Sequence, residues 1–197
     1  MLKISSGILA VFLILLGLEF NGLFTALDPA ISKWLHMVIP RVFYFPLSFF
    51  SLVGSFEITA GIIGVWALIY WKKTKKVPWG LGFFVLLMVI ELFGKTVLVH
   101  PGPPADFFRT TLPFYLPTSH VETNGSFPSG HVSRTVFLVT IGFFWAGRHR
   151  IVFAFCLLTF AFIMAISRIY LGEHWTSDVI GGLLLGSSMG MMAVRFL

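Results

Sequence analysis

The sequence predicts an all-α, polytopic membrane protein with six transmembrane helices and both termini in the cytoplasm. Its 197 residues are 57% hydrophobic and only 11% charged, with a mean hydropathy of +0.91, whereas average soluble chains are roughly 25% charged. The apolar residues fall into runs that are long enough to cross a bilayer, and basic residues flank these runs unevenly. Because so few charges cannot cover a water-soluble globule, the composition excludes an ordinary cytosolic domain, a disordered protein and a nucleic-acid-binding module.

Six apolar runs are the expected spans, and together they leave no room for a soluble domain. They cover approximately residues 4–24, 50–71, 80–99, 131–146, 151–170 and 178–196, and the fourth is the shortest. Since a helical span needs about 20 apolar residues, we expect residues 1–197 to form a single transmembrane domain. The first run is longer than the apolar core of a signal peptide and lacks a small-x-small cleavage site, so we expect an uncleaved span there.

The loop charges predict the orientation, because cytoplasmic loops of membrane proteins are rich in Lys and Arg. If the six spans alternate, eight basic residues share one side: Lys3, Lys72, Lys73, Lys75, Lys76, Arg148, Arg150 and Arg195. We therefore assign that side and both termini to the cytoplasm. The outer side then carries residues 27–49, expected partly along the membrane surface, the polar stretch 100–130, and a short turn at 171–177.

Ionisable side chains next to membrane spans are costly and mark candidate functional sites. Alternating spans bring six of them, from four separate regions, to the outer side: Lys95, His131, Arg134, Arg168, His174 and Asp178. A single one could extend its side chain to the interface. Histidine and aspartate are poorly suited to that, so the whole set indicates a site.

The residue types in this set suit a phosphate group. Lysine and arginine at an apolar-walled site attract an anion, and the planar guanidinium fits phosphate. The segment Pro128-Ser129-Gly130-His131 enters a helix, whose first N–H groups favour a bound anion. His174 and Asp178 are four residues apart and share a helix face, so the carboxylate can fix the histidine tautomer. The two histidines provide a nucleophile and a general acid, although the residues alone leave open which is which.

A metal site is the alternative interpretation. His100, His131, His174 and Asp178 could coordinate zinc. The chain has no HExxH or paired-cysteine pattern, and the neighbouring lysine and arginine side chains would repel a cation. We therefore expect no metal ion and no other cofactor.

Two segments match family signatures. The first is the Pro-Ser-Gly-His tetrapeptide at 128–131, and the second is Ser167-Arg168, five residues, His174, three residues and Asp178. With both motifs at the ends of expected spans, the chain resembles the type 2 phosphatidic acid phosphatase (PAP2) superfamily of membrane lipid phosphatases, whose membrane branch has six spans. The resemblance covers essentially the whole chain.

The remaining family signature is incomplete. The family has Lys, six residues and Arg-Pro, and here Lys95 and Pro103 match while Gly102 replaces the arginine. Arg134, Arg109 and His100 are the candidates to compensate. We expect Arg134 to do so, because it lies three residues after His131 and can share its helix face.

The resemblance implies a role for each site residue. His174 attacks phosphorus and forms a phosphohistidine, Asp178 orients His174, and His131 protonates the leaving oxygen. The phosphoryl oxygens would be held by Lys95, Ser129, the Gly130 N–H and Arg168, to which we add Arg134. No metal is implied. Outside the motifs, Glu91 precedes Lys95 by four residues, which is the favourable order for a helical ion pair. We therefore expect Glu91 to pair with Lys95. The alternative is that Glu91 faces a polar cleft and pairs with a different residue there.

These expectations describe an integral membrane phosphatase that hydrolyses a lipid phosphate or diphosphate at the periplasmic or extracellular face of the cell (inner) membrane. The family substrates are undecaprenyl diphosphate, phosphatidylglycerol phosphate and phosphatidic acid, and we favour the first. The expected partners are this lipid and the bilayer, with no nucleic acid and no prediction of oligomeric state. The alternatives are a lipid phosphotransferase that uses the same phosphohistidine, and a non-catalytic lipid-binding or transport protein with a degraded site.

Overall fold

The computed structural model describes residues 2–110, 112–114, 116–117, 125–146 and 150–197, and all secondary structure in these ranges is helical. Its α-helices are α1 (Leu2–Phe20), α2 (Leu27–Val38), α3 (Tyr44–Ser51), α4 (Phe56–Thr74), α5 (Gly82–Val97), α6 (Gly130–Trp145), α7 (Arg150–Tyr170) and α8 (Thr176–Arg195). Single 3-10 turns lie at Arg41–Phe43, Leu52–Gly54, Trp79–Leu81 and Ala105–Phe107. The expected basic residue Arg148 and the side chain of Arg150 lie outside the described part.

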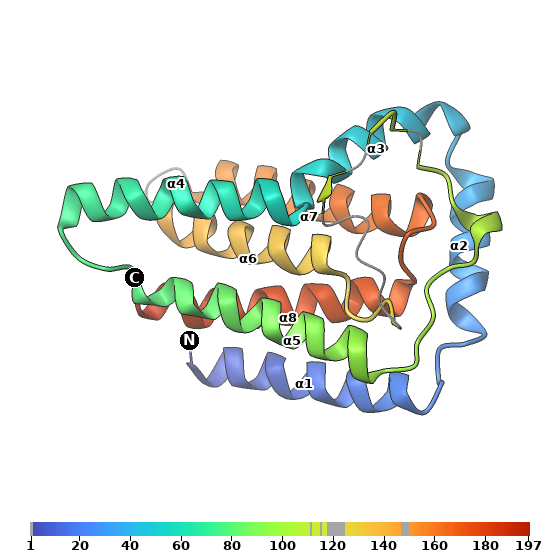
Figure 1. Ribbon diagram of the computed structural model, residues 1–197, viewed down its shortest axis with the longest axis horizontal. Helices are drawn as coiled ribbons and strands as arrows, with labels where there is room; N and C mark the ends of the chain where they lie inside the picture. The colour runs from blue at the N-terminus through green and yellow to red at the C-terminus, as the bar shows by residue number, and fades with distance from the viewer. Residues whose placement is uncertain (1, 111, 115, 118–124, 147–149) are drawn as a thin grey trace.

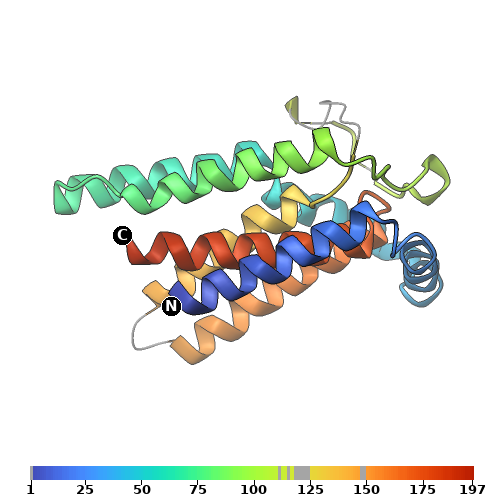
Figure 2. The ribbon, with the colours of Figure 1, turned by 90° about the horizontal axis from the view of Figure 1, so that it is seen from below.

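Six of the helices run side by side along the long axis of the molecule (Figure 1). These are α1, α4, α5, α6, α7 and α8, while α2 lies across one end of them and α3 runs obliquely over the same end. The two termini lie at the opposite end. From below, α4 and α5 form one layer above the other four long helices (Figure 2).

Each predicted span corresponds to one of these six helices, and the largest shift of a boundary is at the start of the second span. The second span was expected from residue 50, but α4 begins at Phe56. Ser55 is extended (φ −62°, ψ 158°) and its side chain accepts a hydrogen bond from the Ile58 N–H, which is the N-cap arrangement that starts a helix. Residues 50–54 instead end α3 and form a 3-10 turn.

Fewer than six helices are long and apolar enough, by themselves, to cross a membrane. Four of the described helical stretches are: Leu2–Phe20, Trp79–Val97, Ile151–Tyr170 and Thr176–Arg195. A fifth arises if Leu27–Val38 and Arg41–Gly54 count as one span, although they are bent by 103°. The predicted second and fourth spans are not among them, because α4 carries Glu57, Lys72 and Lys73 and α6 has only 16 residues. The chain is a multi-pass membrane protein.

The core of the bundle is the contact between α6 and α8, the most extensive of all helix pairs. Glycines on α8 allow it: a Cβ on Gly182 would lie 2.7 Å from the Ser129 carbonyl oxygen, and one on Gly186 would lie 2.4 Å from that of Ser133. Small residues spaced four apart let two helix backbones approach closely. This contact aligns the first turn of α6 with the first turn of α8, where two of the sequence motifs lie.

Candidate active site

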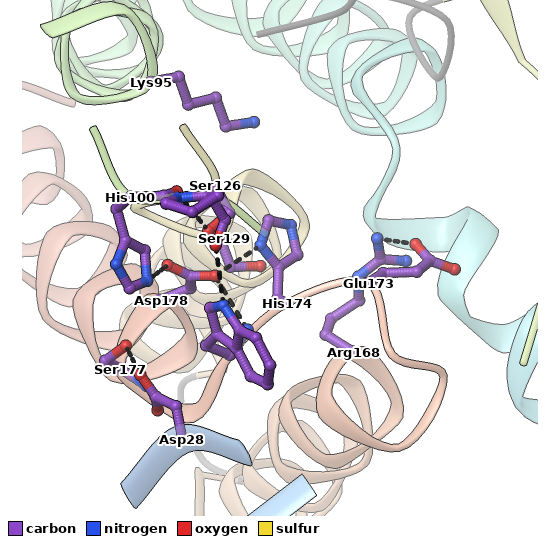
Figure 3. A network of polar contacts seen from close by, with 12 residues as sticks. Asp28, Lys95, His100, Ser126, Ser129, Arg168, Glu173, His174, Ser177 and Asp178 are labelled. Carbon is purple, nitrogen blue, oxygen red and sulfur yellow. Dashed lines mark hydrogen bonds and ion pairs between the residues drawn. The ribbon is translucent and has the colours of Figure 1, made fainter. Parts of the chain in front are cut away.

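The motif residues meet at the end of the bundle that α2 crosses. Five of the predicted residues, from α5, α6, α7 and the α7–α8 turn, line one cavity of about 730 Å³: Lys95, His131, Arg134, Arg168 and His174. In the close view, His174 lies between Asp178 on one side and Arg168 on the other (Figure 3). Segments more than 70 residues apart in the sequence therefore supply one pocket.

His174 and Asp178 form the predicted pair. The His174 Nδ1 lies 3.2 Å from the Asp178 Oδ2, and the Trp175 N–H donates to the same oxygen at 2.9 Å. His174 precedes α8 rather than lying in it, and its backbone is held by the turn in which Gly172 has a φ of 70°. Burial lowers the pKa of His174, although the hydrogen bond to Asp178 acts in the opposite direction. The lowered pKa favours the neutral ring, which a nucleophile requires.

The Pro-Ser-Gly-His segment places two further groups beside this pair. The Ser129 N–H donates to the Asp178 carbonyl oxygen at 2.9 Å, which ties the start of α6 to α8. The Ser129 Oγ is buried and has no hydrogen-bond partner among the described residues. Gly130 is the first residue of α6, so its N–H lies at a helix N-terminus, where backbone donors have no partner within the helix.

Glu91 binds two of the cations that line the cavity. Its Oε1 accepts from the Lys95 Nζ at 2.9 Å, so the predicted ion pair is confirmed. Its Oε2 accepts from the Arg134 Nη1 at 2.8 Å, a contact that links α5 to α6 and that the sequence did not predict. Arg134 also donates from Nε to the Gly54 carbonyl oxygen at 3.2 Å. Glu91 thus holds Lys95 and Arg134 side by side and offsets part of their repulsion.

Replacing Glu91 with glutamine should destabilise the protein by about 3 kcal/mol, because it leaves the buried Arg134 guanidinium without a counter-charge. The free energy of unfolding in detergent micelles measures the effect. Asp106→Asn, which removes an exposed carboxylate at the same end of the bundle, is the matched control and should leave it unchanged. A Glu91→Gln protein with native stability and native activity would show that neither contact matters.

Arg168 has a partner that the sequence did not predict. Its guanidinium forms an ion pair with Glu173, whose carboxylate also accepts a hydrogen bond from the Thr110 hydroxyl. The Arg168 Nε is buried without a hydrogen-bond partner among the described residues, so one donor is available to a ligand. Glu173 directly precedes His174 in the motif, and its own N–H donates to the Arg168 carbonyl oxygen at 3.1 Å. In the sequence, the short spacing of five residues between Arg168 and Glu173 is the local signal for this pair.

Only one of the three candidates to replace the missing motif arginine borders the cavity. Gly102 and Arg134 are both among its described lining residues, whereas Arg109 and His100 are not. Arg109 instead donates from Nη1 to the Asp106 and Phe108 carbonyl oxygens at 2.7 and 2.9 Å. Its position in the cavity and its charge both favour Arg134 as the replacement for the missing motif arginine.

His100 lies against Asp178, and among the described residues the group close enough to hold a metal ion is Glu19, Asp28 and His100 rather than the four-residue set considered above. The His100 Nε2 is 3.4 Å from the Asp178 Oδ1, and its Nδ1 is 3.6 Å from the Glu19 Oε2. Burial lowers the pKa of His100, but the surrounding carboxylates of Asp178, Glu19 and Asp28 outweigh this and raise it. Asp28, which the sequence did not single out, accepts from the Ser177 N–H at 3.0 Å and the Ser177 hydroxyl at 2.6 Å, and so anchors α2 to α8.

The chain is similar in sequence to known proteins. A family model described as the PAP2 superfamily matches residues 76–197. The chain is 40% identical over 102 residues to an Escherichia coli (strain K12) protein provisionally named an undecaprenyl-diphosphatase, a match that spans 51% of this chain and 48% of that relative. It is 28% identical over 190 residues to phosphatidylglycerophosphatase B of Bacillus subtilis (strain 168), spanning 89% and 85% of the two chains. It is 30% identical over 135 residues to an undecaprenyl-diphosphatase of Sulfolobus acidocaldarius, spanning 65% and 59%.

Two solved structures share the fold. A transmembrane PAP2-type phosphatidylglycerolphosphate phosphatase from Bacillus subtilis superposes with a TM-score of 0.78 at 21% identity, over 98% of this chain and 94% of that one. Aquifex aeolicus LpxE superposes with a TM-score of 0.62 at 21% identity, over 86% and 96%. The family match covers more than half of the chain and includes all three motif segments, so the chain belongs to the PAP2 superfamily.

Proposed function

We propose that this chain is a membrane phosphatase that hydrolyses a lipid phosphate or diphosphate through a phosphohistidine. The observation that carries the proposal is the contact of His174 with the buried Asp178, in the same cavity as Lys95 and Arg168. The names of the relatives agree in describing phosphatases of membrane lipids.

The geometry supports a two-step reaction. The free Nε2 of His174 attacks phosphorus, a P–N bond forms, and the bond from phosphorus to the leaving oxygen breaks. His131, which lines the same cavity, gives its proton to that oxygen. In the second step His131 takes a proton from a water molecule, the water oxygen attacks phosphorus, and the P–N bond breaks to release phosphate and restore His174. Asp178 keeps the proton on Nδ1 in both steps.

Positive charge and aligned donors stabilise the transferring phosphoryl group in this proposal. Lys95, Arg134 and Arg168 surround the pocket, and the Ser129 hydroxyl and Gly130 N–H lie at the α6 N-terminus. Preorganised donors of this kind account for a large part of enzymatic rate enhancement. The same cations disfavour a metal ion at the phosphate, so the chemistry as proposed is metal-independent.

The walls of the cavity explain why the substrate would be a lipid. Beyond the charged end, the cavity is lined by apolar side chains of α5 and of the α4 N-terminus: Val85, Met88, Val89, Leu92 and Phe56. An acyl or prenyl chain can lie along these walls while the headgroup reaches His174. The candidate headgroups are those of undecaprenyl diphosphate, phosphatidylglycerol phosphate and phosphatidic acid, and the names of two relatives favour the first.

We further propose that all six parallel helices cross the membrane as a single domain, with both termini in the cytoplasm and the active site on the periplasmic or extracellular side. Two features of the fold support this topology. The six helices lie side by side along one axis, and both termini lie at the end opposite α2 (Figure 1). α6 alone is too short for a typical bilayer, at about 24 Å. Its burial among the other helices means that little of it has to face lipid.

Phosphate release by the purified chain in detergent micelles tests the function. We expect release from at least one of the three lipids at least about 100-fold faster than from a soluble phosphomonoester, because only the lipid fills the apolar part of the cavity. Appearance of the label in a second lipid rather than in free phosphate would identify a phosphotransferase. Binding of all three lipids without turnover of any would identify a non-catalytic protein.

A further inference from the structure

A second cluster of buried polar groups lies behind Asp178, away from the phosphate cavity. Glu19 comes from the end of α1, Asp28 from the start of α2, and His100 from the segment after α5. One ligand atom from each lies within 4.8 Å of the other two, and all three residues are buried. Two helices and the segment after α5 therefore deliver two carboxylates and an imidazole to one point in the interior.

Glu19 gives an independent indication of a ligand at this point. Its side chain is 1% exposed, yet neither of its carboxylate oxygens has a hydrogen-bond partner among the described residues. A buried, ionised carboxylate that accepts no hydrogen bond costs several kcal/mol unless a cation beside it compensates. The group beside it that can carry a positive charge is His100, whose Nδ1 lies 3.6 Å from the Glu19 Oε2, within ion-pair range but too far for a hydrogen bond.

The distance of 3.6 Å between the Glu19 Oε2 and the His100 Nδ1 fits two ligands of one metal ion. Nitrogen and oxygen ligands bonded to a tetrahedral ion at about 2.0–2.2 Å lie about 3.3–3.6 Å from each other. The other ring nitrogen of His100 is 3.4 Å from the Asp178 Oδ1. A histidine that binds a metal through one nitrogen and faces a carboxylate with the other is a recurrent arrangement in metal sites.

We propose that Glu19, Asp28 and the Nδ1 of His100 bind a divalent transition-metal ion behind Asp178. Two carboxylates and an imidazole suit Zn²⁺ or Mn²⁺ better than Mg²⁺ or Ca²⁺, which take mainly oxygen ligands. The surrounding groups support the site: Ser177 orients both oxygens of Asp28, and the Ser126 N–H holds the His100 carbonyl oxygen at 2.8 Å.

The ion does not touch the substrate in this arrangement. It fixes His100 with its proton on Nε2, aimed at the Asp178 Oδ1, while the other oxygen of Asp178 contacts His174 (Figure 3). His100 is then a positioning residue that acts on Asp178. This differs from a metal in the phosphate cavity, and it does not depend on the phosphatase activity proposed above.

Metal content of the full chain tests the site directly. The protein is purified in detergent through an affinity tag without histidines, and bound metal is measured by inductively coupled plasma mass spectrometry. We expect about one equivalent of Zn or Mn in the native protein and in the control variant Asp106→Asn, and little in Glu19→Gln and Asp28→Asn. His131→Ala and His174→Ala should retain it, whereas loss of the metal in these two variants would place the ion at the phosphate site and overturn the proposal.

A titration of the native protein keeps the test independent of whether the variants fold. After stripping with a chelator, added Zn²⁺ or Mn²⁺ should raise the Tm by several degrees, since a ligand that binds only the folded state stabilises it. Mg²⁺ and Ca²⁺ should not. If the Tm of the metal-free native protein does not respond to Zn²⁺ or Mn²⁺, the cluster holds protons instead of a metal ion. If the Tm responds only to Mg²⁺ or Ca²⁺, the assignment of the ligands is wrong.

Discussion

Replacing His174 with alanine should abolish phosphate release from the lipid substrate, because the proposed reaction has no other nucleophile placed against Asp178. The His174 ring is buried, and its Nδ1 lies 3.2 Å from the Asp178 Oδ2. Asp178→Asn should lower kcat about 10³–10⁴-fold, since an amide favours the tautomer with a protonated, non-nucleophilic Nε2. Initial rates with the preferred lipid measure both effects.

A labelling experiment separates loss of the nucleophile from loss of the fold. Native protein quenched during turnover of ³²P-labelled lipid should carry an acid-labile, base-stable label on histidine, and His174→Ala should carry none. His36→Gln is the matched control: the His36 Nε2 contacts the Tyr170 carbonyl oxygen at 2.8 Å, a contact that the glutamine amide can reproduce, and its rate should stay within about two-fold of native. Turnover or label surviving in His174→Ala would refute the phosphohistidine mechanism.

Arg168→Ala should lower kcat/KM about 10²–10³-fold, the range expected when a preorganised donor to the transition state is removed. Arg168 is 4% exposed, and its Nε is free to bind a phosphoryl oxygen. Arg168→Lys should fall between native and alanine, because lysine keeps the charge but not the planar fork. Steady-state rates on the preferred lipid provide the measurement, with the Tm of each variant as the control for folding.

Arg134 permits a sharper version of this test, because the family arginine is missing at Gly102. Arg134→Ala should lower kcat/KM about ten-fold, less than Arg168→Ala, since Glu91 already engages its Nη1. A Cβ at Gly102 would meet the Ser126 Cβ at an ordinary 3.5 Å, so Gly102→Arg is sterically allowed and should recover part of the loss in the Arg134→Ala background. If Arg134→Ala turns over at the native rate while Arg168→Ala is inactive, Arg134 does not compensate for Gly102.

Local spacing in the sequence predicted the six parallel helices and two of the contacts in the site. Apolar runs of span length determine helices whatever their neighbours are. A four-residue spacing is short enough to imply the contacts of Glu91 with Lys95 and of His174 with Asp178. The start of α4 was misplaced because the run is apolar on both sides of Ser55, where the chain breaks the helix. Six spans were predicted, but fewer of the described helices are long and apolar enough to cross a membrane by themselves.

The remaining contacts come from which helices are neighbours. Glu91 meets Arg134 across 43 residues of sequence, Ser177 meets Asp28 across 149, and His100 reaches Asp178 from a segment whose local pattern indicates only a loop. Such contacts depend on the close approach of α6 to α8 and on α2 lying across the end of the bundle. The sequence by itself therefore determined the helices, the motif residues and the paired histidine. Only the tertiary structure decided how the buried charges are paired, because in an apolar interior each charge must find its partner among whatever side chains the packing brings near.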